Sequence, residues 1–117
     1  MDFSLTEEQT LLQESVDRFI QNDYEFDKRQ SFANSELGFS EDNWKMFADL
    51  GWLGIPFSEA DGGFGGGPVD SMIIWEQFGK GLVIEPFLAT VILGGGVLRL
   101  AGNADPKTAY LPRIIDG

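Results

Sequence analysis

The sequence predicts an all-α fold, a helical bundle of five or six helices with a Gly-rich loop. Apolar residues recur at helical spacing in several segments, and a residue type that favours helix starts precedes each segment. No segment alternates polar and apolar residues in the way that a half-buried strand would. With 117 residues, 43% of them hydrophobic, the chain is long enough and apolar enough for one globular domain.

The N-terminal part is expected to hold three helices. The first covers residues 6–22, because Thr6 is a suitable N-cap at the start of a capping box and an apolar stripe follows it. A short second helix is expected within residues 24–33. The third begins after Ser40 and ends at Gly51, since glycine readily adopts the left-handed conformation that stops a helix.

A loop and three more helices are expected in the remaining chain. Seven glycines between residues 51 and 67 predict a structured loop with some left-handed backbone. Pro68 opens the next helix, which is apolar around nearly its whole circumference and is therefore expected to be buried and central. Two further helices are expected, one from residue 86 to about 101 and one from residue 105 to 112.

The charge balance and the missing residue types exclude several classes of site. The net charge of −11 repels phosphate, so nucleic acid is not an expected partner. The chain has no Cys and no His, which excludes disulfides, Cys/His zinc sites and His-based triads, and no metal site is expected. Residues 87–98, the most apolar stretch, are too short to span a bilayer. No basic leader precedes an apolar run near Met1, so the expected localisation is cytoplasmic.

Two groups of residues are candidates for chemistry. The glycine run 62–67 matches no dinucleotide-binding pattern, and Gly81 stands where a phosphate-binding loop needs Ser or Thr after Lys80, so a tight turn is favoured. Glu76 and Glu85 lie in apolar surroundings and are candidates for a general base. The favoured alternative for both is structural: pairing with a neighbouring Lys or Arg, or capping of a helix.

The triple glycine 94–96 is unusual because it falls inside an expected helix. Each interior glycine costs about 1 kcal/mol relative to alanine, so the three together cost about 3 kcal/mol and require a reason. One explanation is close contact with another helix, and the other is room for a ligand against the backbone. An apolar surface one to two turns earlier is formed by Phe87, Ala89, Thr90 and Leu93. Both explanations remain open at this point.

Three blocks of the sequence resemble the N-terminal helical domain of the acyl-CoA dehydrogenase family. They are the opening Phe-Ser-Leu-Thr-Glu-Glu-Gln (3–9), the block Gly-Trp-Leu-Gly-Ile-Pro-Phe-Ser-Glu-Ala-Asp-Gly-Gly-Phe-Gly (51–65), and the closing Ala-Gly-Asn-Ala-Asp-Pro-Lys-Thr-Ala-Tyr-Leu-Pro (101–112). The blocks span the chain in order and with the family's spacing. Residues 79–90 differ from the straight-chain enzymes and resemble a branch that handles dicarboxylic or steroid side-chain thioesters, some as two-gene heteromers.

The resemblance implies that residues 1–117 are one domain of a longer, three-domain enzyme. Such FAD-dependent enzymes dehydrogenate an acyl-CoA: a Glu base removes the α-proton while the β-hydride passes to the flavin. This domain is implied to form one wall of the acyl pocket, with Phe87, Thr90, Leu93 and Gly94 facing the acyl chain. The base and the main flavin-binding residues match nothing in this chain, so the domain alone is expected to be inactive.

The expected partners are an acyl-CoA substrate, the remaining domains of the same chain, and further subunits in a homo- or hetero-oligomer. An alternative is the pocket or interface domain of a non-catalytic subunit of a heteromeric acyl-CoA dehydrogenase. A third hypothesis is an unrelated acidic helical bundle that binds a partner protein through its aromatic faces. The sequence ends on an apolar pair followed by a turn, which is typical of a cut at a domain boundary.

Overall fold

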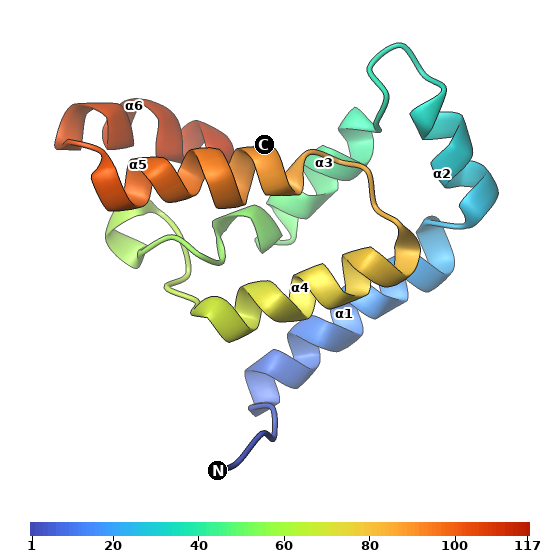
Figure 1. Ribbon diagram of the computed structural model, residues 1–117, viewed down its shortest axis with the longest axis horizontal. Coiled ribbons are helices and arrows are strands. Elements are labelled where there is room, and N and C mark those ends of the chain that lie inside the picture. The colour runs from blue at the N-terminus through green and yellow to red at the C-terminus, as the bar shows by residue number, and fades with distance from the viewer. The chain divides into compact units, whose positions relative to one another are not determined.

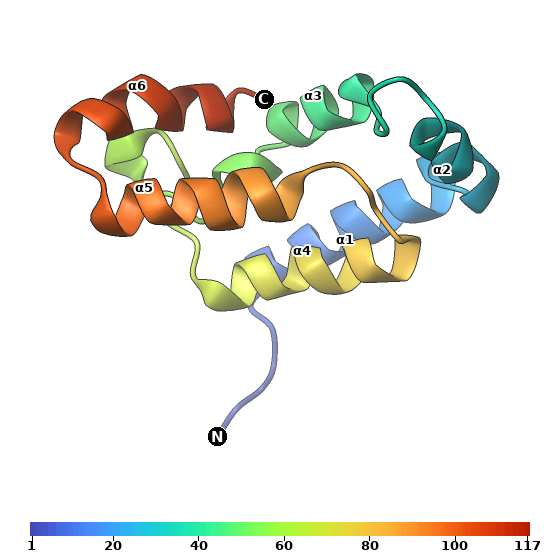
Figure 2. The ribbon, with the colours of Figure 1, turned by 45° about the horizontal axis from the view of Figure 1, so that its top comes forward.

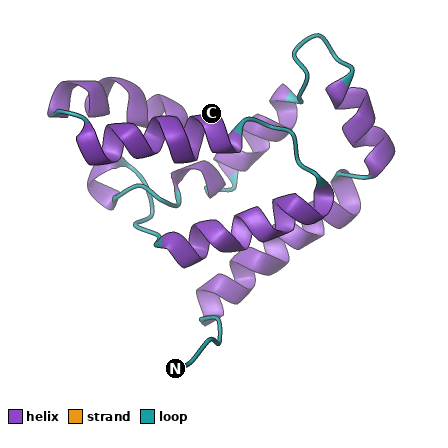
Figure 3. Cartoon of the chain, in the orientation of Figure 1, coloured by secondary structure: helices purple, strands orange, loops and turns teal.

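A computed structural model describes all residues from 1 to 117 and contains six α-helices and no strand (Figure 3). The predicted all-α fold class is therefore confirmed. The chain divides into two compact units, each built from two stretches of sequence. Unit 1 comprises Met1–Gly38 and Pro68–Ile84, and unit 2 comprises Phe39–Gly67 and Glu85–Gly117. Figure 1 labels the helices.

Unit 1 is built from three helices: α1 (Glu7–Asp23), α2 (Phe26–Ala33) and α4 (Pro68–Gly81). The starts of α1 and α4 match the sequence signals at Thr6 and Pro68. The Thr6 hydroxyl accepts a hydrogen bond from the backbone N–H of Gln9 at 3.1 Å, and the Gln9 side chain accepts one from the N–H of Thr6 at 3.0 Å. The predicted capping box is thus confirmed, and two otherwise unsatisfied donors at the helix start are satisfied.

Helices α1 and α4 lie side by side and supply most of the core of unit 1 (Figures 1 and 2). Their buried apolar side chains are Val16, Phe19, Ile73, Ile74 and Phe78. The prediction that α4 is buried all round is wrong, because Val69 is 45% exposed and Met72 is 54% exposed. Apolar residues on every side allow a helix to be fully buried, but the neighbouring elements determine which sides are actually buried.

The segment after α4 is fixed to the α1–α2 corner by two long-range hydrogen bonds. The Tyr24 hydroxyl accepts from the backbone N–H of Ile84 at 3.1 Å. The Arg29 side chain donates through Nε to the carbonyl of Leu82 at 3.1 Å. Leu82 has a positive φ of 52°, so these contacts hold a turn that its own backbone disfavours.

Unit 2 contains the other three α-helices and three short or irregular ones. They are α3 (Glu41–Asp49), the 3-10 helices η1 (Trp52–Gly54) and η2 (Glu59–Asp61), the π-helix η3 (Leu88–Gly94), α5 (Gly95–Ala101) and α6 (Ala104–Ile115). Ser40 caps α3 and Gly51 follows it with φ 81°, both as predicted. The core is aromatic: the Phe47 and Trp52 ring centroids lie 5.3 Å apart.

Two predicted helices of unit 2 differ in detail from the structure. The helix expected from residue 86 to about 101 consists of η3 and α5 joined end to end, so a π-helical part replaces half of it. The last helix begins two residues earlier than Pro106 and continues through Pro112 to Ile115. Pro112 removes one backbone donor, but the fully buried Leu111 beside it anchors this part of the helix. Neither these helices nor those of unit 1 are long and apolar enough to cross a membrane.

Candidate functional site

The four residues implied to face an acyl chain lie along one helical segment of unit 2. Phe87 immediately precedes η3, Thr90 and Leu93 lie within η3, and Gly94 is its last residue. Phe87 is buried with 1% of its surface exposed, whereas Leu93 is 58% exposed. Thr90 is half-buried and Gly94 is exposed. The structure therefore places three of the four at the surface and Phe87 in the core beneath them.

A groove of about 470 Å³ runs between this segment, α3 and α6. Its volume falls within the range of roughly 300–1,000 Å³ that is typical of ligand sites. Thr90 and Gly94 line it, whereas Phe87 and Leu93 do not. Apolar side chains dominate the lining, with two hydroxyls and one guanidinium among them. The lining residues are Trp44, Thr90, Gly94, Leu98, Tyr110, Arg113, Ile114 and Gly117.

The η3 segment is a π-helix, a form that occurs mostly as single widened turns and often at functional sites. The N–H of Gly95 donates to the carbonyl of Thr90, five residues earlier, as well as to that of Ile92. Sequence reasoning missed this feature, because a π-turn depends on where the helix is anchored at both ends. The local signal that could have indicated it is the triple glycine at its C-terminal end.

The three glycines of this segment have different surroundings. A Cβ atom on Gly95 would clash with the ring of Phe57, so Gly95 is required by close packing. A Cβ on Gly94 would approach the carbonyl of Ala89 at 3.2 Å, and Gly94 also borders the groove. A Cβ on Gly96 would meet nothing within 4 Å. Close packing therefore explains one glycine, and space beside a groove is found at another.

The glycine-rich loop does not form a phosphate cradle. The backbone N–H groups of residues 62–66 all donate to backbone carbonyls of the same loop, at distances from 2.7 to 3.1 Å. Since none of these five amides is left to bind an anion, a phosphate-binding role is excluded for them. Gly62 and Gly65 have positive φ angles of 91° and 68°, which confirms the predicted tight turn.

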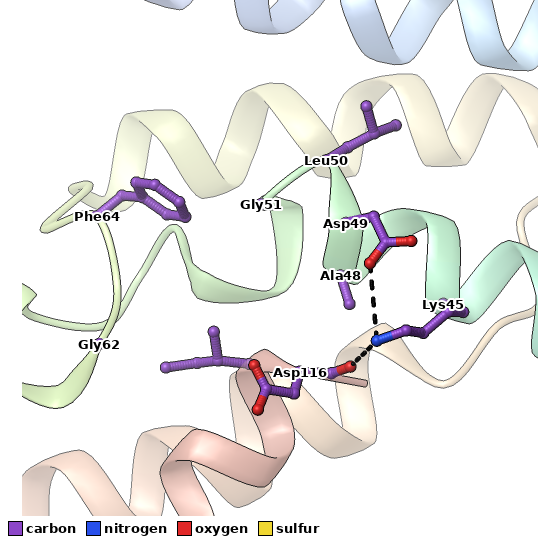
Figure 4. A pocket seen from close by; sticks show the side chains of 9 residues that line it. Lys45, Ala48, Asp49, Leu50, Gly51, Gly62, Phe64 and Asp116 are labelled. Atoms are coloured by element: carbon purple, nitrogen blue, oxygen red, sulfur yellow. Dashed lines mark hydrogen bonds and ion pairs between the residues drawn. The ribbon is translucent and has the colours of Figure 1, made fainter.

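A second, smaller pocket of about 220 Å³ lies between the end of α3, the glycine-rich loop and the end of α6 (Figure 4). Lys45 lies at its edge and is already engaged: Nζ lies 3.6 Å from the Asp49 carboxylate and donates to the carbonyl of Asp116 at 2.9 Å. The ring of Phe64 covers Gly51, where a Cβ would approach it at 2.9 Å. No group of three metal-ligating side chains occurs here or elsewhere in the chain.

The two carboxylates considered as bases take structural positions. Glu76 is exposed and its Oε1 lies 3.4 Å from Nζ of Lys80, one helical turn later, which is the pairing that was the favoured alternative. Glu85 is 5% exposed and accepts a hydrogen bond from the Asn43 side chain at 3.1 Å. This bond joins the start of the η3 segment to α3. Neither carboxylate lines the groove.

Residues 6–117 match the family described as "Acyl-CoA dehydrogenase, N-terminal domain". Acryloyl-CoA reductase (NADH) of Anaerotignum propionicum is 30% identical over 118 residues, which cover 100% of this chain and 29% of that protein. The probable acyl-CoA dehydrogenase YngJ of Bacillus subtilis is 30% identical over 119 residues, covering 100% and 31%. Mitochondrial isovaleryl-CoA dehydrogenase of Bos taurus is 29% identical over 115 residues, covering 97% and 27%. No solved structure matches the chain.

The chain spans less than a third of the length of these relatives. The names of two of them refer to different acyl thioesters, acryloyl-CoA and isovaleryl-CoA. The dicarboxylic or steroid branch that residues 79–90 resemble is therefore not confirmed, and it stays a prediction.

Proposed function

Because the chain belongs to the acyl-CoA dehydrogenase N-terminal domain family, we propose that it is the helical N-terminal domain of an FAD-dependent acyl-CoA dehydrogenase. In this role residues 1–117 form one wall of the acyl pocket, and further domains of a three-domain chain complete it. The observation that carries the proposal is the family match over residues 6–117. The apolar groove beside η3 supports it, since an acyl chain needs such a surface.

The groove residues supply contact area rather than chemistry. Gly94 and Leu98 present a surface on which a methylene chain leaves water, which contributes about 0.8 kcal/mol per buried CH₂ group. Leu93, exposed on the same segment, extends the apolar surface beyond the groove. Phe87 supports the segment from the core side.

The flavin, when bound, supplies the hydride acceptor of the reaction. This chain does not offer a site for its phosphates, because the amides of residues 62–66 are already used within their own loop. The net charge of −11 also opposes phosphate binding. We therefore assign flavin binding and the catalytic base to the other domains of the proposed enzyme, and no catalytic residue to this one.

The proposal is tested with the complete gene product, by following the oxidation of acyl-CoA thioesters of increasing length with an artificial electron acceptor. Thr90→Trp fills the groove, so KM for the longest thioesters should rise about tenfold or more, equivalent to about 1.4 kcal/mol. The shortest thioester should be affected much less. Thr108→Trp is the matched control, because Thr108 is an exposed threonine of α6 that lines neither pocket.

Two outcomes would count against this function. If Thr90→Trp and Thr108→Trp changed the chain-length profile equally, the groove would not hold the acyl chain. If the wild-type gene product bound acyl-CoA without oxidising it, the alternative role in a non-catalytic subunit would replace the proposed one.

A further inference from the structure

We propose that Phe57 is a positioning residue: the glycine-rich segment holds it so that its ring sets the position of the η3–α5 junction and hence the shape of the groove. The part that concerns the acyl chain rests on the function proposed above. Phe57 lies within the 51–65 block, but the resemblance implies no role for it. Its side chain is fully buried and lines neither the groove nor the smaller pocket.

The backbone of Phe57 is fixed on both sides by the glycine-rich segment. Its N–H donates to the carbonyl of Gly54 at 3.2 Å, and its own carbonyl accepts from Gly65 at 2.7 Å. Gly63 closes the loop so tightly that a Cβ there would clash with the Phe57 carbonyl and lie 2.5 Å from that of Gly54. The tight turn therefore holds the backbone of Phe57 in a fixed position.

The ring of Phe57 meets the helix at Gly95. A Cβ on Gly95 would clash with Cζ of the ring and lie 2.8 Å from Cε1. Because the ring is fully buried, it cannot turn into solvent to make room. The contact between the Phe57 ring and the backbone of Gly95 therefore determines how closely the helix approaches the glycine-rich segment.

The contact is transmitted to the groove by a backbone hydrogen bond. Gly95 donates its N–H to the carbonyl of Thr90, across the widened π-turn. Thr90 and Gly94 both line the groove. A displacement of Gly95 away from the Phe57 ring would therefore move two lining residues, although neither Phe57 nor Gly95 borders the groove itself. Phe57 thus influences which acyl chains fit, because it holds the groove wall at Thr90 and Gly94 in place from the core side.

The test combines four variants of the complete gene product with two measurements, the melting temperature and kcat/KM as a function of acyl length. Gly95→Ala introduces the clash, and we expect the melting temperature to fall by roughly 3–10 °C and the preferred chain length to change. Phe57→Leu removes the Cζ and Cε atoms. The double variant should lose less stability than the sum of the single losses and should restore the wild-type chain-length preference. Gly96→Ala is the matched control, because its Cβ meets no neighbour within 4 Å.

Each outcome supports or overturns the proposal. Additive losses in the double variant would show that Phe57 and Gly95 do not oppose each other. Non-additive losses of stability, with the same chain-length profile in every variant, would show that Phe57 and Gly95 pack together but do not shape the groove. This result would overturn the positioning role. If Gly95→Ala alone does not accumulate as folded protein, folding of the double variant supports the contact; if neither folds, the chain-length profile of Phe57→Leu decides. A wild type that oxidises no acyl-CoA overturns the proposed function, whereas the stability results still report on the packing contact.

Discussion

The chain has two glycine clusters, one in the segment between α3 and α4 and one at the η3–α5 junction, and they are glycine for different reasons. In the loop, Gly51, Gly62 and Gly65 have positive φ, and the amides after Asp61 are consumed by nearby carbonyls. In the helix, Gly94 to Gly96 have no positive φ, and only Gly95 is restricted by a neighbouring side chain. Gly62 and Gly65 are thus required by their own backbone conformation, whereas Gly95 is required by the Phe57 ring that lies against it.

The largest effect is expected from Gly63→Ala, which breaks the loop. Its new Cβ would meet the carbonyls of Phe57 and Gly54, which are backbone atoms already held by hydrogen bonds. We expect a loss of about 3 kcal/mol or more in the free energy of unfolding, measured by urea denaturation. A loss below about 1 kcal/mol would show that this loop can relax and does not fix Phe57.

A smaller loss is expected from Gly65→Ala in the same loop. Gly65 has φ 68° but open space around the position of a Cβ, so only the left-handed backbone opposes a side chain. The expected loss is about 1–2 kcal/mol. Gly65→Asn should lose less, because asparagine tolerates this conformation better than alanine. Equal losses for both variants would point to a cause other than backbone conformation.

The helix cluster should respond in the opposite direction. Gly96→Ala adds a side chain where nothing lies within 4 Å and where the backbone is helical. Alanine should therefore stabilise the protein by about 0.5–1 kcal/mol, seen as a higher melting temperature. A loss of stability at this position would mean that another part of the complete protein packs closely against Gly96.

No measurable effect is expected when FAD or inorganic phosphate is added to the 117-residue chain alone. The purified chain should be colourless, should not oxidise acyl-CoA, and should show no saturable FAD binding below about 10 μM, which corresponds to roughly −7 kcal/mol. In a two-dimensional NMR titration the amides of residues 62–66 should not shift with phosphate, because carbonyls occupy them. Tight flavin binding by these residues would contradict the division of roles between domains.

The elements that could be predicted from the sequence depend on local interactions. The Thr6 capping box, the Ser40 cap and the Gly51 stop each involve residues within four positions of one another, and all three occur in the structure. The burial of α4 could not be predicted, since Val69 and Met72 are exposed or covered according to neighbours far away in the sequence. The π-turn could not be predicted for the same reason, since Gly95 at its C-terminal end packs against Phe57 of a distant segment.

The groove was only partly predictable for the same reason. Thr90 and Gly94 belong to a segment whose composition is unusual in itself, and both line the groove. No unusual composition marks the three groove residues from α3 and α6, which are Trp44, Tyr110 and Arg113. They approach η3 only after folding. The sequence around each of these three residues reads as an ordinary amphipathic helix.

The widened turn at η3 also sets a rule for how this region tolerates changes in length. Successive residues of a regular α-helix are turned by about 100° about its axis. The residues of a π-turn are turned by less than this, because each turn holds more residues. Deleting one residue from Leu88–Gly94 would therefore convert the π-turn to regular helix and leave α5 in nearly the same orientation to the Phe57 ring. Gly95 would then still lie opposite the ring. Relatives without the widened turn should therefore have one residue fewer before this glycine and still place a glycine opposite the ring.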